Sequence, residues 1–381
     1  VTFCIDAALT SFTVQRKRAA IALGASFLMV MAPWFASVWR FMHYGTAQGK
    51  AVEVVVLQPN IDPYSQKFGG MDAMEQVERM LDLASAKITD TTALIVFPET
   101  ALQEGATVDM RTGELVLNGL WENNLEGSRS VRRLRRFQQE HPRVALLIGM
   151  SSDKLLGRDE VLTVAARPLG DDRNWYESYN AALWMPARGG LRSYHKSKLV
   201  AGPETMPFEE VLGPLTDLAL DLGGTTGTLG QQEERSVLRD GASGLAVAPA
   251  ICYESVFGEH VAEHVRNGAQ LIAVITNDGW WDDSPGYKQH LAFSSIRAIE
   301  TRRDVVRSAN TGTSCTVDQR GVIHNGTSWW EPTAFRATVN SNQEITFFVA
   351  HGDLIGKAAV PIAAIVLLVV VVQHFRKRRS V

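Results

Sequence analysis

The strongest constraint on this chain is a pair of long apolar stretches, one near each end. Residues 19–39 carry no charged side chain, and residues 358–372 form a second run rich in Val, Ile and Leu. About 20 apolar residues cross the hydrocarbon core of a bilayer as a helix. The sequence therefore predicts transmembrane helices over residues 19–41 and 354–373, the second with the Lys357 ammonium extended to the bilayer surface. A cleaved signal peptide is the alternative for the first stretch, and a buried core helix is the alternative for the second.

Basic residues flank both stretches on the side facing away from the middle of the chain. Residues 16–18 and 376–379 are all Arg or Lys, and such clusters favour the cytoplasmic side of a membrane. We therefore expect residues 1–18 and 374–381 to be cytoplasmic segments of an inner-membrane protein. Residues 50–350 then lie on the opposite face, which is periplasmic in a bacterium with two membranes. The first residue is not Met, so we also expect the N-terminal segment to be truncated.

The composition is that of a large mixed domain. The chain has 381 residues, 45% of them hydrophobic, which is enough to bury a large core. The 38 basic and 41 acidic side chains give a formal net charge of −3, so we expect no concentrated basic face and no nucleic-acid partner. Apolar segments of strand length and helix length alternate, which favours a layered α/β fold.

The expected elements follow this alternation along the chain. Strands are predicted over residues 52–57, 93–97, 144–149, 271–276 and 305–309, and helices over residues 71–87, 128–140, 259–267 and 288–303. Residues 178–185 and 191–194 are predicted to pair as a hairpin, and residues 313–318 and 344–349 are predicted to be late strands. A loop of low hydrophobicity over residues 223–240 precedes the apolar run that ends at Cys252.

Reactive or polar groups follow four of the predicted strands. Glu99, Lys196 and Cys252 each come at the end of an apolar segment, and Asn277-Asp278-Gly279-Trp280 follows another. In open α/β folds, sites assemble at the carboxyl ends of the strands. The four motifs are therefore compatible with one shared site.

A cysteine nucleophile needs a base for its proton and a partner for the charge that develops. Glu99 is the candidate base, and Lys196 is the candidate partner of an oxyanion. Each residue also has an ordinary interpretation: Cys252 as a core residue or as the disulfide partner of Cys315, Glu99 as a helix cap, and Lys196 as a solvated side chain. The sequence carries no metal-ligand cluster and no glycine-rich phosphate loop, so we expect no metal and no cofactor.

The order of the motifs resembles that of a known family. Phe97-Pro98-Glu99, Tyr194-His195-Lys196, Ile251-Cys252-Tyr253-Glu254 and Asn277-Asp278-Gly279-Trp280 follow one another as the corresponding motifs do in the nitrilase superfamily. Because a membrane span flanks the domain on each side, the chain is similar within that superfamily to the apolipoprotein N-acyltransferases. The resemblance covers about residues 50–350. It implies an α/β fold, a nitrilase-like αββα sandwich flanked by transmembrane helices.

The resemblance also implies roles for individual residues. Carried over by position, Glu99 is the general base, Lys196 the oxyanion partner and Cys252 the nucleophile. Substrate-binding or supporting positions of the family match Phe68, Glu204, Tyr253 and Glu254. This chain reads Gly-Pro-Glu at residues 202–204 where the family usually reads Phe-Gly-Glu. Family members also carry further membrane spans ahead of the domain.

The function that the resemblance implies is the transfer of an acyl chain. A phospholipid would donate the chain to Cys252 as a thioester, and the amino group of an N-terminal diacylglyceryl-cysteine on an apolipoprotein would accept it. The alternative is a membrane-tethered nitrilase-type amidase that hydrolyses a C–N bond with the same three residues. A third interpretation is a domain that only binds lipid or lipoprotein, against which the presence of all three residues argues.

Overall fold

The computed structural model describes residues 5–6, 16–45, 49–67, 70–109, 116–170, 174–205 and 228–379. Phe68, one of the predicted site residues, lies outside these ranges. The chain divides into two compact units, residues 1–47 and 48–381, and each is described by itself.

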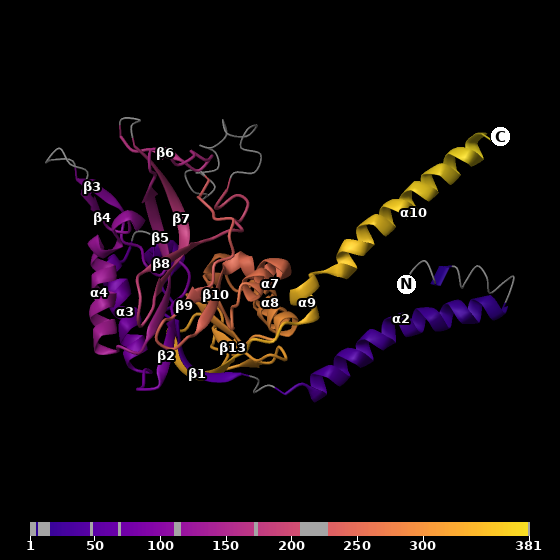
Figure 1. The fold of residues 1–381 in the computed structure, drawn as a ribbon, viewed down its shortest axis with the longest axis horizontal. Helices are drawn as coiled ribbons and strands as arrows, with labels where there is room; N and C mark the ends of the chain where they lie inside the picture. The colour runs from indigo at the N-terminus through magenta and orange to yellow at the C-terminus, as the bar shows by residue number, and fades with distance from the viewer. Residues whose placement is uncertain are drawn as a thin grey trace. The chain divides into compact units, whose positions relative to one another are not determined.

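Both predicted apolar helices form (Figure 1). α2 spans Arg16–His43 and α10 spans Leu354–Arg379. Within them, Ala20–His43 and Leu354–Arg376 are long and apolar enough to cross a membrane. The apolar side chains of α10 are exposed, so the alternative of a buried core helix is wrong for this segment. Each helix contains one proline, which membrane helices tolerate.

The larger unit is built on two mixed β-sheets. The first has the strand order β15-β1-β2-β5-β7-β6, with β8 paired to β7. β1, β2 and β5 run parallel, whereas β15 is antiparallel to β1 and β7 is antiparallel to β5. The strands span Lys50–Gln58 (β1), Thr92–Val96 (β2), Ala145–Leu155 (β5), Arg167–Pro168 (β6), Trp175–Met185 (β7), Arg192–His195 (β8) and Thr333–Ser341 (β15).

The second sheet has the strand order β14-β13-β12-β11-β10-β9. β10, β11 and β12 run parallel, and β9 and β13 pair antiparallel to their neighbours. The strands span Leu238–Arg239 (β9), Ala246–Ile251 (β10), Leu271–Thr276 (β11), Val305–Ala309 (β12), Cys315–Val317 (β13) and Ile323–His324 (β14). β3 (Thr107–Asp109) and β4 (Val116–Asn118) form a separate two-stranded sheet.

Helices cover the outer face of each sheet, and the inner faces of the sheets pack on each other (Figure 1). α3 (Ala73–Ser85) and α4 (Arg129–Glu140) share an apolar cluster with the first sheet, and α7 (Gly258–Arg266) and α8 (Pro285–Thr301) share one with the second. Between the sheets, Val56 and Leu94 lie in one cluster with Ile251 and Ile275. Each such buried side chain contributes roughly 1.5–3 kcal/mol. The order helix, sheet, sheet, helix confirms the predicted αββα sandwich.

Polar side chains fix where the outer helices begin. Asp72 Oδ1 accepts a hydrogen bond from the Met74 N–H at 2.9 Å, and Ser128 Oγ accepts one from the Val131 N–H at 3.2 Å. These are the N-caps of α3 and α4, and both lie within one residue of a predicted helix start. The 3₁₀ turn η2 (Glu122–Gly127) leads into α4.

Two elements late in the chain differ from the prediction. The strand predicted over residues 344–349 is wrong, because α9 (Phe347–His351) forms there instead. Thr346 Oγ1 caps this helix by accepting the Val349 N–H at 3.1 Å. Hydrophobic periodicity cannot distinguish a strand from a helix in a short apolar run, so the capping hydroxyl of Thr346 decides that a helix forms. β15 was not predicted, and it pairs with β1 along its whole length.

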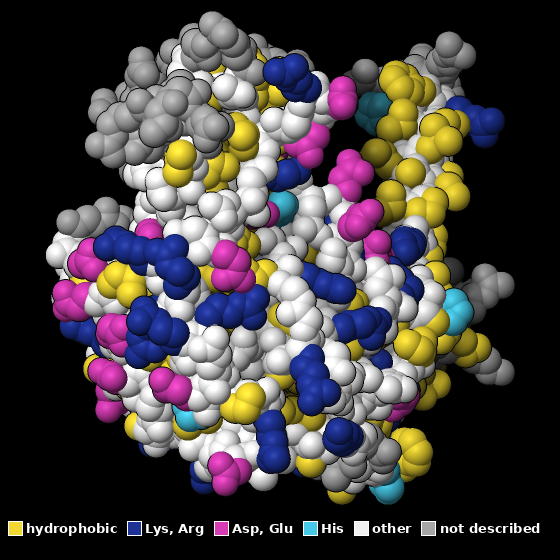
Figure 2. Space-filling model, turned by 60° about the vertical axis from the view of Figure 1, so that its left-hand side comes forward, with side chains coloured by type: hydrophobic (Ala, Val, Ile, Leu, Met, Phe, Trp, Pro, Cys, Tyr) yellow, Lys and Arg dark blue, Asp and Glu magenta, His cyan; other side chains and the backbone are white. Residues whose placement is uncertain are grey.

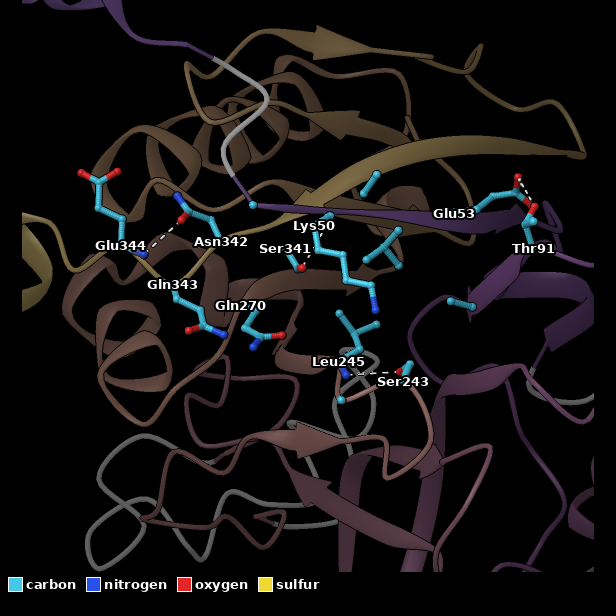
Figure 3. A pocket seen from close by; sticks show the side chains of 15 residues that line it. Lys50, Glu53, Thr91, Ser243, Leu245, Gln270, Ser341, Asn342, Gln343 and Glu344 are labelled. Carbon is cyan, nitrogen blue, oxygen red and sulfur yellow. Dashed lines mark hydrogen bonds between the residues drawn. The ribbon is translucent and has the colours of Figure 1, made fainter.

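The surface carries charge of both signs, and a hollow lies among its described residues. Figure 2 shows Lys and Arg side chains interspersed with Asp and Glu over the visible face of the domain. The hollow is lined by Lys50 and Glu53 of β1, Leu245 before β10 and Gln270 before β11 (Figure 3). It therefore opens where these strands begin, at the end of β10 opposite to Cys252, and it is not the candidate site.

Candidate active site

Cys252 occupies a strained position directly after β10. It opens the 3₁₀ turn η4 (Cys252–Val256), and its φ of 51° lies in the left-handed region that non-glycine residues rarely adopt. The residue is 8% exposed. Cys252 and Cys315 are both free thiols, so the alternative of a disulfide between them is wrong. A conformation of this kind is costly and is found at sites where a side chain has to be presented in one direction.

Glu99 lies directly after β2, and a glycine of β5 allows its close packing. Gly149 donates its N–H to the Pro98 carbonyl at 3.1 Å. A Cβ atom at Gly149 would lie 2.6 Å from the Glu99 Cα, so only glycine permits this approach. The next residue, Thr100, also has a positive φ, of 47°. The backbone around Glu99 is therefore held in one conformation.

Lys196 is buried between two carboxylates. It is 1% exposed, and its Nζ donates to Glu204 Oε1 at 2.7 Å and to Glu99 Oε1 at 3.3 Å. Asn180 of β7 donates both N–H groups of its amide to the same two oxygens, each at 2.8 Å. Within the described part of the chain, the other Glu99 oxygen, Oε2, is buried and accepts no hydrogen bond. That oxygen is the free acceptor for a proton in this site.

Burial dominates the electrostatics of the thiol. Burial, together with the charge of Glu99, raises the pKa of Cys252 to about 12, against a smaller lowering by Lys196 and a hydrogen bond with Thr276. Burial alone would lower the pKa of Lys196, but the negative charges of Glu99 and Glu204 and a hydrogen bond with Glu204 raise it above its ordinary value. At neutral pH the site therefore holds a protonated thiol beside a lysine cation. A base has to remove the thiol proton as the nucleophile attacks.

Glu254 connects the turn of the nucleophile to the Lys196 segment. Its Oε2 accepts the N–H of the residue before Cys252 at 2.8 Å, and its Oε1 accepts the N–H of the residue after Lys196 at 2.6 Å. The Tyr194 hydroxyl donates to Oε1 at 2.8 Å. Burial raises the pKa of Glu254 to about 7, against the opposing effect of these hydrogen bonds. One carboxylate thus sets the position of Cys252 relative to Lys196.

Two further residues of this site were not predicted from the sequence. Asn180 lies inside a predicted hairpin strand, and its polar side chain among apolar neighbours is the signal that could have indicated a buried partner. Lys67 ends the turn η1 (Pro63–Lys67), and its buried Nζ donates to the Glu99 carbonyl at 2.8 Å. Burial lowers the pKa of Lys67 to about 7, against the raising effect of Glu99 and Cys252. A lysine in a loop carries no such signal in the sequence.

Of the remaining predicted residues, Glu204 contacts Lys196 within this cluster, whereas Tyr253 points to the surface. Glu204 Oε2 accepts the Val200 N–H at 2.8 Å, so a short loop positions this carboxylate. Tyr253 is exposed, with its ring edge-on to that of Phe257 at 5.1 Å between centroids. The described residues include no group of three His, Cys, Asp or Glu side chains placed to hold a metal ion. The catalytic roles of the predicted residues stay predictions, and the structure brings Glu99, Lys196 and Glu204 into direct contact.

Comparison with known proteins agrees with the geometry. A family model described as carbon-nitrogen hydrolase matches residues 53–345, which include every residue of this cluster. The chain belongs to the carbon-nitrogen hydrolase family. The sequence predicted that the chemistry of this family member takes place at a thiol, a glutamate and a lysine that lie at strand ends.

Relatives of this family member include proteins named as acyltransferases. It is 32% identical to an apolipoprotein N-acyltransferase of Chlorobaculum tepidum over 84% of this chain and 57% of that protein. It is 30% identical to one of Vibrio vulnificus over 49% of this chain and 35% of that protein. The chain therefore spans about half of the first relative's length and about a third of the second's.

A solved structure shows the same fold. Nit3 of Saccharomyces cerevisiae, a member of the nitrilase superfamily, superposes with a TM-score of 0.52 and 16% identity, covering 78% of this chain and 92% of Nit3. At this identity the likeness concerns the fold alone, and it confirms the nitrilase-like architecture.

Proposed function

We propose that this member of the carbon-nitrogen hydrolase family transfers an acyl chain from a phospholipid to the N-terminal diacylglyceryl-cysteine of apolipoproteins, with Cys252 as the acyl carrier. The observation that carries the proposal is the buried thiol whose surroundings supply a free carboxylate oxygen on Glu99 and a cation on Lys196. The two apolar helices and the names of the relatives support lipid-linked substrates. A membrane-tethered amidase would carry the same two helices, so it is the names of the relatives that favour acyl transfer over this alternative.

The first half of the reaction forms a thioester. Glu99 Oε2 accepts the thiol proton while Cys252 Sγ attacks the ester carbonyl of the phospholipid. The carbonyl oxygen becomes an oxyanion, which the Lys196 charge stabilises. The intermediate then expels the glycerol oxygen, which takes the proton from Glu99 and leaves as a lysophospholipid. The acyl chain remains on Sγ.

The second half returns the enzyme to its starting state. The amino group of the acceptor attacks the thioester carbonyl and gives one proton to Glu99. The second intermediate expels Cys252 as a thiolate, and an amide bond holds the acyl chain on the acceptor. The thiolate then recovers its proton from Glu99. Glu99 thus accepts and returns one proton in each half of the reaction, and the site ends with the charges it began with.

We further propose a membrane topology. The domain of residues 50–350 lies in the periplasm, and residues 1–18 and 374–381 lie in the cytoplasm, with spans over residues 19–41 and 354–373. The basic clusters outside both spans support this orientation. Proteolysis of spheroplasts with a protease that cannot cross the membrane tests it. Cleavage in the domain, with a C-terminal tag protected, is expected, and a digested tag contradicts the orientation.

Mass spectrometry of the purified full chain tests the reaction. After incubation in detergent with a phospholipid of defined acyl chains, an acyl adduct on the Cys252 peptide is expected in the wild type. Cys252→Ala should show none, whereas Cys315→Ala should match the wild type, because Cys315 is a buried free thiol on β13. The adduct should then move to a synthetic diacylglyceryl-cysteine peptide. Adduct formation in Cys252→Ala, or release of ammonia from amide substrates without transfer, would contradict the proposal.

A further inference from the structure

The fourth sequence motif supplies a buried charged cluster behind the nucleophile. Asp278 opens the turn η5 (Asp278–Trp281), His290 lies on α8 and Arg307 lies on β12. Arg307 Nη2 donates to Asp278 Oδ2 at 2.7 Å, and His290 Nδ1 lies 3.0 Å from Asp278 Oδ1. All three residues are buried. None of them has a part in the proton transfers proposed above.

This cluster ends on the backbone of Cys252. His290 Nε2 lies 3.0 Å from the Cys252 carbonyl oxygen, and Ser255 Oγ donates to the same oxygen at 2.8 Å. Thr276 connects the other side of the residue, because its hydroxyl bonds the thiol and donates to Asp278 Oδ1 at 3.1 Å. The nucleophile is therefore held at both its carbonyl and its side chain.

The packing around the cluster leaves no freedom for the imidazole. A Cβ atom at Gly312 would lie 2.6 Å from Asp278 Oδ2, so the chain closes directly over that carboxylate. The ring of Trp281 stands edge-on to the His290 ring, with 5.1 Å between centroids. His290 is thus fixed through Asp278 on one side and by an aromatic ring on the other.

A hydrogen bond to this carbonyl matters because of the conformation of Cys252. At a φ of 51° the residue is in a costly conformation that relaxes unless its surroundings hold it. Relaxation of φ is a rotation about the N–Cα bond, which turns the carbonyl and the Cα–Cβ bond together and so moves Sγ. Holding the carbonyl therefore holds the direction of the thiol.

We propose that His290 is a positioning residue for the nucleophile: its hydrogen bond to the Cys252 carbonyl keeps the thiol directed at the substrate, and Asp278 and Arg307 act by orienting the imidazole. The inference rests on the proposed function to the extent that Cys252 is the acyl carrier. It also gives a role to Asp278, which the sequence motif alone did not assign.

A set of isosteric variants separates positioning from ordinary stability. His290→Gln places an amide N–H near the original Nε2 and keeps the donor to Cys252. His290→Asn places its amide near the original Nδ1, and His290→Leu has no donor, so both lose that bond. Gln138→Leu is the matched control, since the amide nitrogen of Gln138 on α4 donates its two hydrogens among the main-chain carbonyls of residues 144, 185 and 186, outside this cluster.

The readout is the single-turnover rate at which the full chain in detergent forms the acyl adduct on Cys252, corrected for folded protein by circular dichroism. We expect His290→Leu and His290→Asn to be slower by about 10- to 100-fold, as for the loss of one positioning hydrogen bond. His290→Gln should stay within about fivefold of the wild type. Gln138→Leu should lower the melting temperature and leave the corrected rate unchanged.

Alkylation of Cys252 by iodoacetamide gives a second measurement that needs no acyl substrate. Its rate should follow the same order among the variants. If the wild type forms no acyl adduct but alkylation still depends on the His290 donor, the proposed function fails and the positioning role stands. If His290→Leu matches the wild type in both corrected rates, or if His290→Gln is as slow as His290→Leu, the positioning role is wrong.

Discussion

Asn180→Asp is the substitution that most directly tests how the two glutamates share one lysine. The change is isosteric, but it replaces the two N–H groups that Glu99 and Glu204 accept at 2.8 Å each with a carboxyl group. If ionised, this group would be a third negative charge beside a single Lys196 cation. The structure therefore predicts a variant whose stability and activity depend strongly on pH.

The size of the effect follows from these distances. Two like charges 2.8 Å apart repel by about 6 kcal/mol at an effective dielectric constant of 20. Keeping the new carboxyl neutral at pH 7 costs only about 4 kcal/mol, because its unperturbed pKa is about 3.9. The folded protein will therefore take up a proton instead. A neutral carboxyl donates one hydrogen bond where the amide donated two, and the loss of the other adds about 1.5–3 kcal/mol.

The direction of the pH dependence is fixed by the same reasoning. The new carboxyl binds its proton more tightly in the folded state than in the unfolded state. The free energy of unfolding, relative to wild type, should fall by about 1.4 kcal/mol per pH unit above pH 4. The loss is then about 4 kcal/mol at pH 7 and about 1.5 kcal/mol at pH 5 from protonation alone. Activity should recover in the same direction.

Urea unfolding of the full chain in detergent, at pH 5 and pH 7, measures this difference. Asn180→Ala loses the same hydrogen bonds without a new charge, so its loss of stability should be the same at both pH values. Asn118→Asp introduces a carboxyl at an exposed position of β4 and should behave as the wild type. If Asn180→Asp has the same pH dependence as Asn180→Ala, the three-carboxylate argument is refuted.

Three further outcomes are expected from the structure. Gly149→Ala places a Cβ atom 2.6 Å from the Glu99 Cα. The variant should destabilise the domain by about 1–3 kcal/mol and slow acyl-adduct formation at least about tenfold. Unchanged kinetics would contradict the close packing of Gly149 on Glu99. Lys67→Met should raise the melting temperature at pH 7, because burial in the folded state lowers the pKa of Lys67 to about 7 and the charged amine therefore destabilises the folded protein. The gain should vanish by about pH 10.5, where the amine is neutral in both the folded and the unfolded state. A gain that does not depend on pH would refute this reasoning. Glu104→Gln should lower the free energy of unfolding by about 2–3 kcal/mol at pH 7. Burial alone would raise the pKa of Glu104, but hydrogen bonds from Ser128 and the first N–H groups of α4 lower it to about 2. The loss should shrink as the pH falls from about 4.5 towards 2, and a loss that stays constant would show that the charge is not involved.

The sequence alone predicted the architecture and several residues of the candidate site. Strand and helix periods are local properties, so β1, β2, β10, β11 and α4 could be predicted from short windows. Glu99, Lys196 and Cys252 could be predicted because each follows an apolar segment, and because strand ends converge in folds of this class; Glu204 and Glu254 were predicted from the family resemblance. The apolar helices were equally evident, since length and composition are sufficient to recognise them.

Only the tertiary structure decided which other side chains complete the site. Asn180, Lys67 and His290 reach Glu99 or Cys252 across separations of 81, 32 and 38 residues, and nothing in a local window reports such contacts. The helix α9 was missed for a related reason, because the Thr346 hydroxyl that starts it also donates to the Glu300 carbonyl 46 residues away. Periodicity shows which face of an element is buried. The partner of a buried polar group is decided by how the two sheets pack, and that packing alone places the amide, the lysine and the imidazole around the thiol.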